Sequence, residues 1–200
     1  MIKIYGKKES RAVRCLWALE ELGLPYEHVS IDSDGNENRT AAYLALNPSG
    51  KIPTLVEDDF ILTESMAITF YLASKKPGML MPSDLKQQAT AWKWSLWAAT
   101  EAEFHISLIV RELRKTSESA DQKRISESMN NLSATLLVLE SHLEQGGDYL
   151  VLDSFCIADL NTASVICYLD MIGFKREPFP KTSAWLERCL SRPAWLAVQN

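Results

Sequence analysis

The stretch KKESRAVRCLWALEELGLPYE, residues 7–27, places a serine and two arginines where a polar loop becomes an apolar helix. Ser10 precedes the helical pattern, and Arg14 follows Ser10 by four positions. The first turn of a helix has unpaired N–H groups and the positive end of the helix dipole, so it can hold an anionic ligand. A plain helix cap at Ser10 explains the same residues, and this stretch alone leaves both readings open.

A second stretch, LTESMAITFYL at residues 62–72, repeats this arrangement. Ser65 and the backbone N–H groups beside it would stabilise a ligand carboxylate at a helix start. Glu64 could pair with an amine on the same ligand. The alternative is again structural, with Thr63 or Ser65 as an N-cap and Glu64 as a first-turn acid.

The third stretch is NPSGKIPTL, residues 47–55, where Pro53 enters an expected strand. A cis bond before Pro53 would leave the backbone of Ile52 facing outward, free to pair with an extended peptide, whereas an ordinary trans proline would only end the loop. At one end of a sheet the three features suit a thiol near Ser10, a peptide backbone at Ile52 and an α-amino acid group at Ser65. Glutathione contains these three parts.

These features require an α/β unit that brings several loops to one edge of a sheet. The apolar spacing predicts the order β-α-β-α-β-β-α, in which the first two strands are parallel and joined by a right-handed crossover. Asp58-Asp59 is the expected turn of a hairpin. The expected elements are a strand at 2–5, a helix at 10–22 ended by Gly23, a strand at 26–31, a short helix ending near 46, strands at 54–57 and 60–62, and a helix from 63 or 64 to 75.

In the second half of the chain, the spacing of apolar residues predicts helices only. Apolar residues of one expected helix alternate spacings of three and four, as in a bundle seam; a dimeric coiled coil uses the same pattern, but this seam is short. The expected helices are a long one at 85–115, the seam helix around 125–143, an apolar one at 156–171 and a last one at 182–190, before Pro193. We therefore expect a thioredoxin-like domain at 1–76, a linker rich in Pro and Gly at 77–84 and an all-α domain at 85–200.

Composition excludes several classes of protein. The 200 residues are 46% hydrophobic and 24% charged with a formal net charge of -5, so bulk binding to nucleic acid is not expected. No apolar run approaches the length that spans a membrane, and no signal peptide opens the chain. The four cysteines have no metal-ligand spacing. We expect free thiols, no metal and a cytoplasmic protein.

The sequence resembles the cytosolic glutathione S-transferases, in particular their serine-dependent bacterial, theta-like type. The resemblance rests on SRAVRCLWALEELGLPYE, NPSGKIPTL, LTESMAITFYL and, in the second half, FCIADL at 155–160. It implies a thioredoxin-like domain followed by a helical domain, a cis bond before Pro53 and glutathione as co-substrate. It also implies a small hydrophobic electrophile bound by the helical domain, and a homodimer.

The resemblance implies a catalytic role for Ser10, supported by Arg14. A thiol of pKa about 8.5 is only a few per cent ionised at neutral pH. A hydrogen bond from the Ser10 hydroxyl and a helix N-terminus would together stabilise the glutathione thiolate. Ser10 is thus expected to donate to the sulfur and not to act as a nucleophile, because no His or carboxylate is spaced to activate it. Tyr5, at the end of the first strand, matches the catalytic tyrosine of other classes and is the competing candidate.

The same resemblance assigns the binding residues. Lys51 and Ile52, with Pro53, match the loop that holds the cysteinyl and glycyl parts of glutathione. Glu64 and Ser65 match the site of the γ-glutamyl part. These matches imply a transferase that activates glutathione for attack on a small electrophile.

Two rival functions use the same fold. One is a glutathione-dependent disulfide reductase or peroxidase, and the other is a non-catalytic binding module. A maleylacetoacetate isomerase is disfavoured, because the loop reads Lys8-Glu9-Ser10 where that enzyme has Ser-Ser-Cys. The identity of the electrophile and the helical residues around it are not encoded in any motif.

One departure from the family pattern concerns the helix that begins near Cys156. The family has Ser or Thr followed three residues later by Asp, which forms a capping box. Here Cys156 replaces the hydroxyl residue, and a thiol is a weak acceptor. We therefore expect Asp159 to provide the stronger part of this cap.

Overall fold

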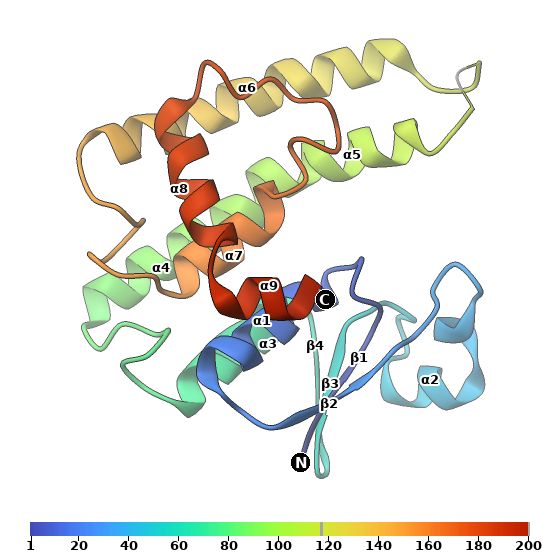
Figure 1. Ribbon diagram of the computed structural model, residues 1–200. Coiled ribbons are helices and arrows are strands. Elements are labelled where there is room, and N and C mark those ends of the chain that lie inside the picture. The colour runs from blue at the N-terminus through green and yellow to red at the C-terminus, as the bar shows by residue number, and fades with distance from the viewer. Residues whose placement is uncertain (117, 200) are drawn as a thin grey trace. The chain divides into compact units, whose positions relative to one another are not determined.

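The computed structural model describes residues 1–116 and 118–199. Its internal contacts divide the chain into two units, which are described separately. The first unit contains residues 1–83 and the segment from Arg192 onward, and the second contains Asp84–Ser191 (Figure 1). No helix in the described part of the chain is both long enough and apolar enough to cross a bilayer.

The first unit is built on a four-stranded sheet of order β2-β1-β3-β4. The strands are β1 (Ile2–Tyr5), β2 (Tyr26–Val29), β3 (Thr54–Glu57) and β4 (Phe60–Thr63). β1 pairs with β2 in parallel, and the other neighbours are antiparallel. The expected β-α-β unit and hairpin are both confirmed, and together with the second unit they make the expected α/β plus all-α architecture.

The helices of the first unit are α1 (Ala12–Leu22), α2 (Ala41–Leu46), α3 (Ser65–Lys75) and a short 3-10 turn at Glu37–Arg39. Helix α1 begins two residues later than expected, because Ser10 is part of a turn. It ends at Gly23, whose φ of 57° is left-handed and whose N–H bonds to the last carbonyls, as the sequence predicts.

A further helix, α9 (Pro193–Gln199), corrects the expectation that the last helix ends before Pro193. Proline is compatible with a helix start, because its missing N–H would have no partner in the first turn. The expected all-α domain extended to residue 200, whereas α9 packs against α1 and belongs to the first unit. The Trp195 ring of α9 lies 4.8 Å from the Trp17 ring of α1, centroid to centroid.

The second unit contains helices and, among its described residues, no strand. Its helices are α4 (Leu85–Trp97), α5 (Glu103–Leu113), α6 (Gln122–Glu144), α7 (Ile157–Ile166) and α8 (Pro180–Leu190). The single long helix expected over 85–115 is wrong in one respect: a π-helical turn at Ala98–Ala102 separates α4 from α5. Such a turn inserts extra backbone without a break in the chain direction, so the apolar spacing does not reveal it.

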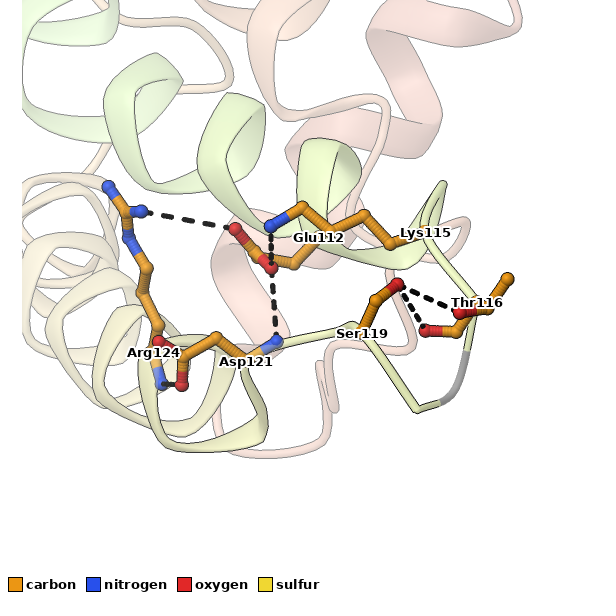
Figure 2. Close-up of polar contacts among 6 residues, drawn as sticks. All are labelled: Glu112, Lys115, Thr116, Ser119, Asp121 and Arg124. Atoms are coloured by element: carbon orange, nitrogen blue, oxygen red, sulfur yellow. Dashed lines mark hydrogen bonds and ion pairs between the residues drawn. The ribbon is translucent and has the colours of Figure 1, made fainter.

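A buried carboxylate fastens the loop between α5 and α6 (Figure 2). Glu112 is 1% exposed, and it accepts hydrogen bonds from Lys115 Nζ at 2.6 Å and from the backbone N–H of Asp121 at 3.1 Å. Arg124 Nη1 lies 3.9 Å from its other oxygen. Asp121 in turn caps α6 by accepting from the Arg124 N–H at 3.0 Å. The Lys115 hydrogen bond is the main reason that the pKa of Glu112 is lowered.

Asp159 occupies the first turn of α7, whose residues are all buried. Its carboxylate accepts from the backbone N–H of Cys156 at 3.0 Å, so the expected carboxylate part of the cap is confirmed. It also accepts from the backbone N–H of Leu150 at 2.9 Å and from the indole N–H of Trp185 at 2.8 Å. Asp159 therefore joins α7 to a loop and to α8, beyond the capping role that the sequence predicts.

Candidate active site

Ser10 lies in the turn between β1 and α1, close to the first helical N–H. Its Oγ accepts from the Ala12 N–H at 3.1 Å and donates to the Lys7 carbonyl at 2.7 Å. The turn is tight because Gly6 has a φ of +148°, and a Cβ there would lie 2.9 Å from the Ala12 Cβ. Ser10 thus acts in part as the cap of α1, one of the two roles considered from the sequence. A hydroxyl proton can rotate, so Ser10 can exchange the Lys7 carbonyl for another acceptor and still accept from Ala12.

Arg14 connects this end of α1 to the start of α3. The Arg14 side chain is buried, and its Nη1 donates to the Ser65 Oγ at 3.3 Å. Cys15 makes a second link, from its Sγ to the Ser65 carbonyl at 3.6 Å. Burial raises the pKa of the Cys15 thiol to about 12, in keeping with a packed and unreactive side chain. The N-terminal ends of α1 and α3 are therefore held together.

The start of α3 differs from an ordinary capped helix. Among the described residues, the Glu64 side chain at the N-cap position accepts no hydrogen bond from the first turn. Glu64 is exposed and has a φ of +68°, a left-handed conformation that is unusual for a residue other than glycine. Backbone strain of this kind is typical of binding sites. Ser65 uses its oxygen as the acceptor from Arg14, so its own O–H can still donate to another acceptor.

Lys51, Ile52 and Pro53 form the loop before β3. The Ile52–Pro53 bond is cis, as the resemblance implies. The Lys51 carbonyl accepts from the Tyr43 hydroxyl and from the Asn47 side-chain amide, each at 2.7 Å. These bonds fix the loop on α2 and leave the Lys51 side chain exposed.

Ile52 has a backbone that pairs with no other part of the described chain. Neither its N–H nor its C=O forms a hydrogen bond with a described residue. The side chain is half-buried, while the following Pro53 is buried. An extended peptide backbone could use the two free groups of Ile52 in the manner of an added strand.

Tyr5, the competing catalytic candidate, is half-buried at the end of β1. Its ring lies 6.4 Å from the ring of Tyr43 on α2, centroid to centroid. Side chains alternate along a strand, so Tyr5 and the buried Ile4 point to opposite faces of the sheet. Of the two catalytic candidates, Ser10 is the one that adjoins a helix start, because its Oγ accepts from the Ala12 N–H.

Two residues that support the site were not expected from the sequence, namely Tyr43 and Asn47. Both are buried, and both hold the Lys51 carbonyl, Tyr43 from eight residues earlier and Asn47 from four. Tyr43 also hydrogen-bonds to the Thr54 hydroxyl at 2.9 Å. The one available signal was Asn47 before Pro48 at a helix end, which is also what an ordinary turn contains.

The sequence matches two family descriptions. Residues 1–74 match "Glutathione S-transferase, N-terminal domain", and residues 97–193 match "Glutathione S-transferase, C-terminal domain". Glutathione S-transferase GstB of Escherichia coli is 33% identical over 199 residues, which cover 97% of this chain and 95% of that protein.

Solved structures of glutathione transferases are also similar to this chain. The crystal structure of glutathione transferase F7 from Populus trichocarpa is 32% identical with a TM-score of 0.90, covering 100% of this chain and 98% of that one. A glutathione transferase homologue from Sulfitobacter, solved with bound glutathione, is 28% identical with a TM-score of 0.85, covering 100% and 97%.

Proposed function

Because the chain belongs to the glutathione S-transferase family, we propose that it binds glutathione across Ile52 and Ser65 and activates its thiol for attack on a small hydrophobic electrophile. The observation that carries this proposal is the bond from Arg14 to the Ser65 hydroxyl at the uncapped start of α3. That bond gives Ser65 a defined direction for its own O–H. Glutathione is a substrate here, and the chemistry requires no metal.

The carboxylate of the γ-glutamyl part would lie at the N-terminus of α3. There it accepts from the Ser65 hydroxyl and from the first N–H groups of the helix, with the dipole and the Arg14 charge nearby. The exposed Glu64 carboxylate would pair with the α-amino group. The Sulfitobacter homologue, which was solved with glutathione, supports this choice of ligand.

The cysteinyl part would pair with the backbone N–H and C=O of Ile52. Lys51, exposed beside it, would attract the glycyl carboxylate. Tyr43 and Asn47 fix the Lys51 carbonyl and thus restrict the loop before any ligand arrives. A loop restricted in this way loses less conformational entropy on binding.

Ser10 would activate the thiol. Its O–H leaves the Lys7 carbonyl and donates to the sulfur, while the α1 N-terminus adds a favourable dipole. These two effects favour the thiolate and lower the pKa of the thiol. We prefer Ser10 to Tyr5 because it adjoins the α1 start, and the serine-dependent, theta-like subclass stays part of this proposal.

The second substrate and the assembly are also proposed. An electrophile would bind in the helical domain, and two copies of the chain would form a homodimer in the cytoplasm. Exposed apolar side chains on α4 and α5 support a protein interface there: Trp92 is 42%, Leu96 57% and Phe104 60% exposed. Several large exposed apolar side chains on neighbouring elements are typical of such surfaces. Light scattering at micromolar concentration should give a dimer mass, and a monomer mass would contradict this assignment.

The decisive experiment combines glutathione calorimetry with an activity panel. We expect saturable glutathione binding and conjugation of an aryl halide. Turnover of disulfides or peroxides with little conjugation would favour a reductase or peroxidase. A failure to bind glutathione would identify a non-catalytic module.

A further inference from the structure

The C-terminal helix α9 forms part of the surroundings of α1. Trp17, in the middle of α1, is fully buried, and its ring contacts that of Trp195 at 4.8 Å with an interplanar angle of 58°. Val198 of α9 is also buried. Nearly all of α1 is buried by the elements packed around it, which include α3, β1 and α9.

An ion pair joins Arg192, the residue before α9, to the C-terminal end of α1. Arg192 donates from Nε and Nη2 to the two carboxylate oxygens of Glu21, at 2.6 and 2.7 Å. Glu21 also accepts from the Trp17 indole N–H at 3.0 Å. The Glu21 side chain is only 8% exposed. A bidentate arginine–carboxylate pair that is partly shielded from water is directional and stronger than an ordinary surface pair.

Helix α1 depends on such contacts for its position. It has 11 residues, and isolated helices of this length are marginally stable in water. Its N-terminal end is held by the close approach of Gly6 and by the Arg14 bond to Ser65. Its C-terminal end is held by the ion pair that Arg192 makes with Glu21.

We propose that Arg192 is a positioning residue, which fixes α1 through Glu21 and thereby aims the Ser10 hydroxyl at the glutathione sulfur. This inference rests on the role proposed for Ser10. Arg192 pairs with Glu21 at the end of α1 opposite Ser10, so its effect on the thiol would be indirect. Its effect would pass along α1 to the first turn, where the Ala12 N–H donates to the Ser10 Oγ at 3.1 Å.

The γ-glutamyl site should be much less affected. Ser65 is the first residue of α3, which packs against β4 as well as α1. Its bonds to α1 come from Arg14 and Cys15, near the N-terminal end of α1, and not from the end that Arg192 holds. Loosening the C-terminal end of α1 should therefore change the activation of the thiol more than the affinity for glutathione.

The test is Arg192→Gln in the full-length protein, with two readouts. We expect the pKa of enzyme-bound glutathione, from ultraviolet thiolate absorbance, to rise by about half a unit, which is roughly a threefold loss of thiolate below that pKa. We expect kcat for conjugation to fall by a similar factor at neutral pH. The KM for glutathione should stay within about twofold, since the binding residues are intact.

Two matched variants separate positioning from stability. Arg188→Gln, on α8, removes another arginine ion pair, with Asp148 at 3.0 Å, and should leave the thiol pKa unchanged. Arg192→Lys keeps the charge without the planar fork and should recover part of the lost kcat. If Arg192→Gln does not fold, the double variant Glu21→Gln with Arg192→Gln removes the unpaired buried charge and should give the same pKa shift.

The outcomes are separable from those of the proposed function. An unshifted thiol pKa in the folded Arg192 variants overturns the inference, as does an equal loss of kcat in Arg188→Gln. If Ser10→Ala also leaves the thiol pKa unchanged, the proposed role of Ser10 fails as well. A shift in Ser10→Ala without one in Arg192→Gln rejects the positioning role alone.

Discussion

The start of α3 and the start of α7 differ in what satisfies their first backbone N–H groups. At α7, the internal carboxylate of Asp159 accepts from three buried donors and faces no solvent. At α3, no N-cap side chain accepts from the first turn among the described residues, and the Ser65 hydroxyl is held by Arg14. A helix start closed by an internal acid stabilises the fold, whereas an uncapped one beside an arginine is available to a carboxylate from outside.

The start of α8 resembles that of α7, because an acid from the protein accepts from its first backbone N–H groups. Glu140 of α6, buried to 4% exposure, accepts from the backbone N–H groups of Lys181 and Thr182 at 2.9 and 2.8 Å. The second unit therefore uses buried acids from its own chain at two helix starts. The comparison predicts that substitutions at closed starts change stability, and substitutions at the open start change binding and turnover.

The largest effect is expected at the closed start. Asp159→Ala should lower the free energy of unfolding by at least about 3 kcal/mol, because three buried donors lose their acceptor at about 1 to 3 kcal/mol each. Urea melts measure this, with Asp148→Ala as the control for an exposed ion pair. An unchanged urea midpoint for Asp159→Ala would break the comparison.

Ser10→Ala should act on chemistry. Its kcat should fall by about 10- to 100-fold, the equivalent of a lost hydrogen bond to a charged group, and the pKa of bound glutathione should rise. Glutathione affinity should change little, and the free energy of unfolding should fall by no more than about 0.5 to 2 kcal/mol, because the Ala12 N–H loses its acceptor. The matched variant is Tyr5→Phe: if it abolishes turnover while Ser10→Ala does not, the tyrosine is the thiolate donor.

Ser65→Ala should act on binding. Glutathione affinity should weaken by about 1 to 3 kcal/mol, because the ligand carboxylate loses a hydroxyl donor at the α3 start. Calorimetry measures this, and Ser74→Ala at the far end of the same helix is the control. Equal affinities for the two variants would remove Ser65 from the site.

The smallest effect concerns the weak part of the α7 cap. Cys156→Ser introduces a better acceptor at the N-cap and should be neutral or stabilising by up to about 1 kcal/mol. The change in urea midpoint gives the sign. A clear loss of stability would mean that the apolar surroundings of Cys156 outweigh the cap, since a buried hydroxyl without a partner is unfavourable.

Much of the fold was predictable because it depends on local patterns. The spacing of apolar residues indicated α1 and α3, and Gly23 indicated where α1 ends. The π-helical turn at Ala98–Ala102 and the helix α9 were not predicted. The turn keeps the helical periodicity on both sides, and Pro193 is equally compatible with a helix start and with a chain that leaves one.

The candidate site was predictable in part. Ser10, Ile52 and Ser65 follow from motifs in which polar residues adjoin helix or strand starts. Tyr43 and Asn47 could not be identified, because a polar side chain in the sequence does not indicate which carbonyl it will reach.

By itself, the sequence determined roughly where most helices and strands lie, which face of each is apolar and which hydroxyl and charged groups stand near the helix starts. Only the tertiary structure decided that Arg14 reaches Ser65 across 51 positions and that Arg192 reaches Glu21 across 171. Periodicity and capping act over three or four residues, so they are visible in the sequence. Partners distant in the chain are selected by the packing of whole elements, which also decides which helix start is capped by an acid of the protein and which has no capping side chain among the described residues.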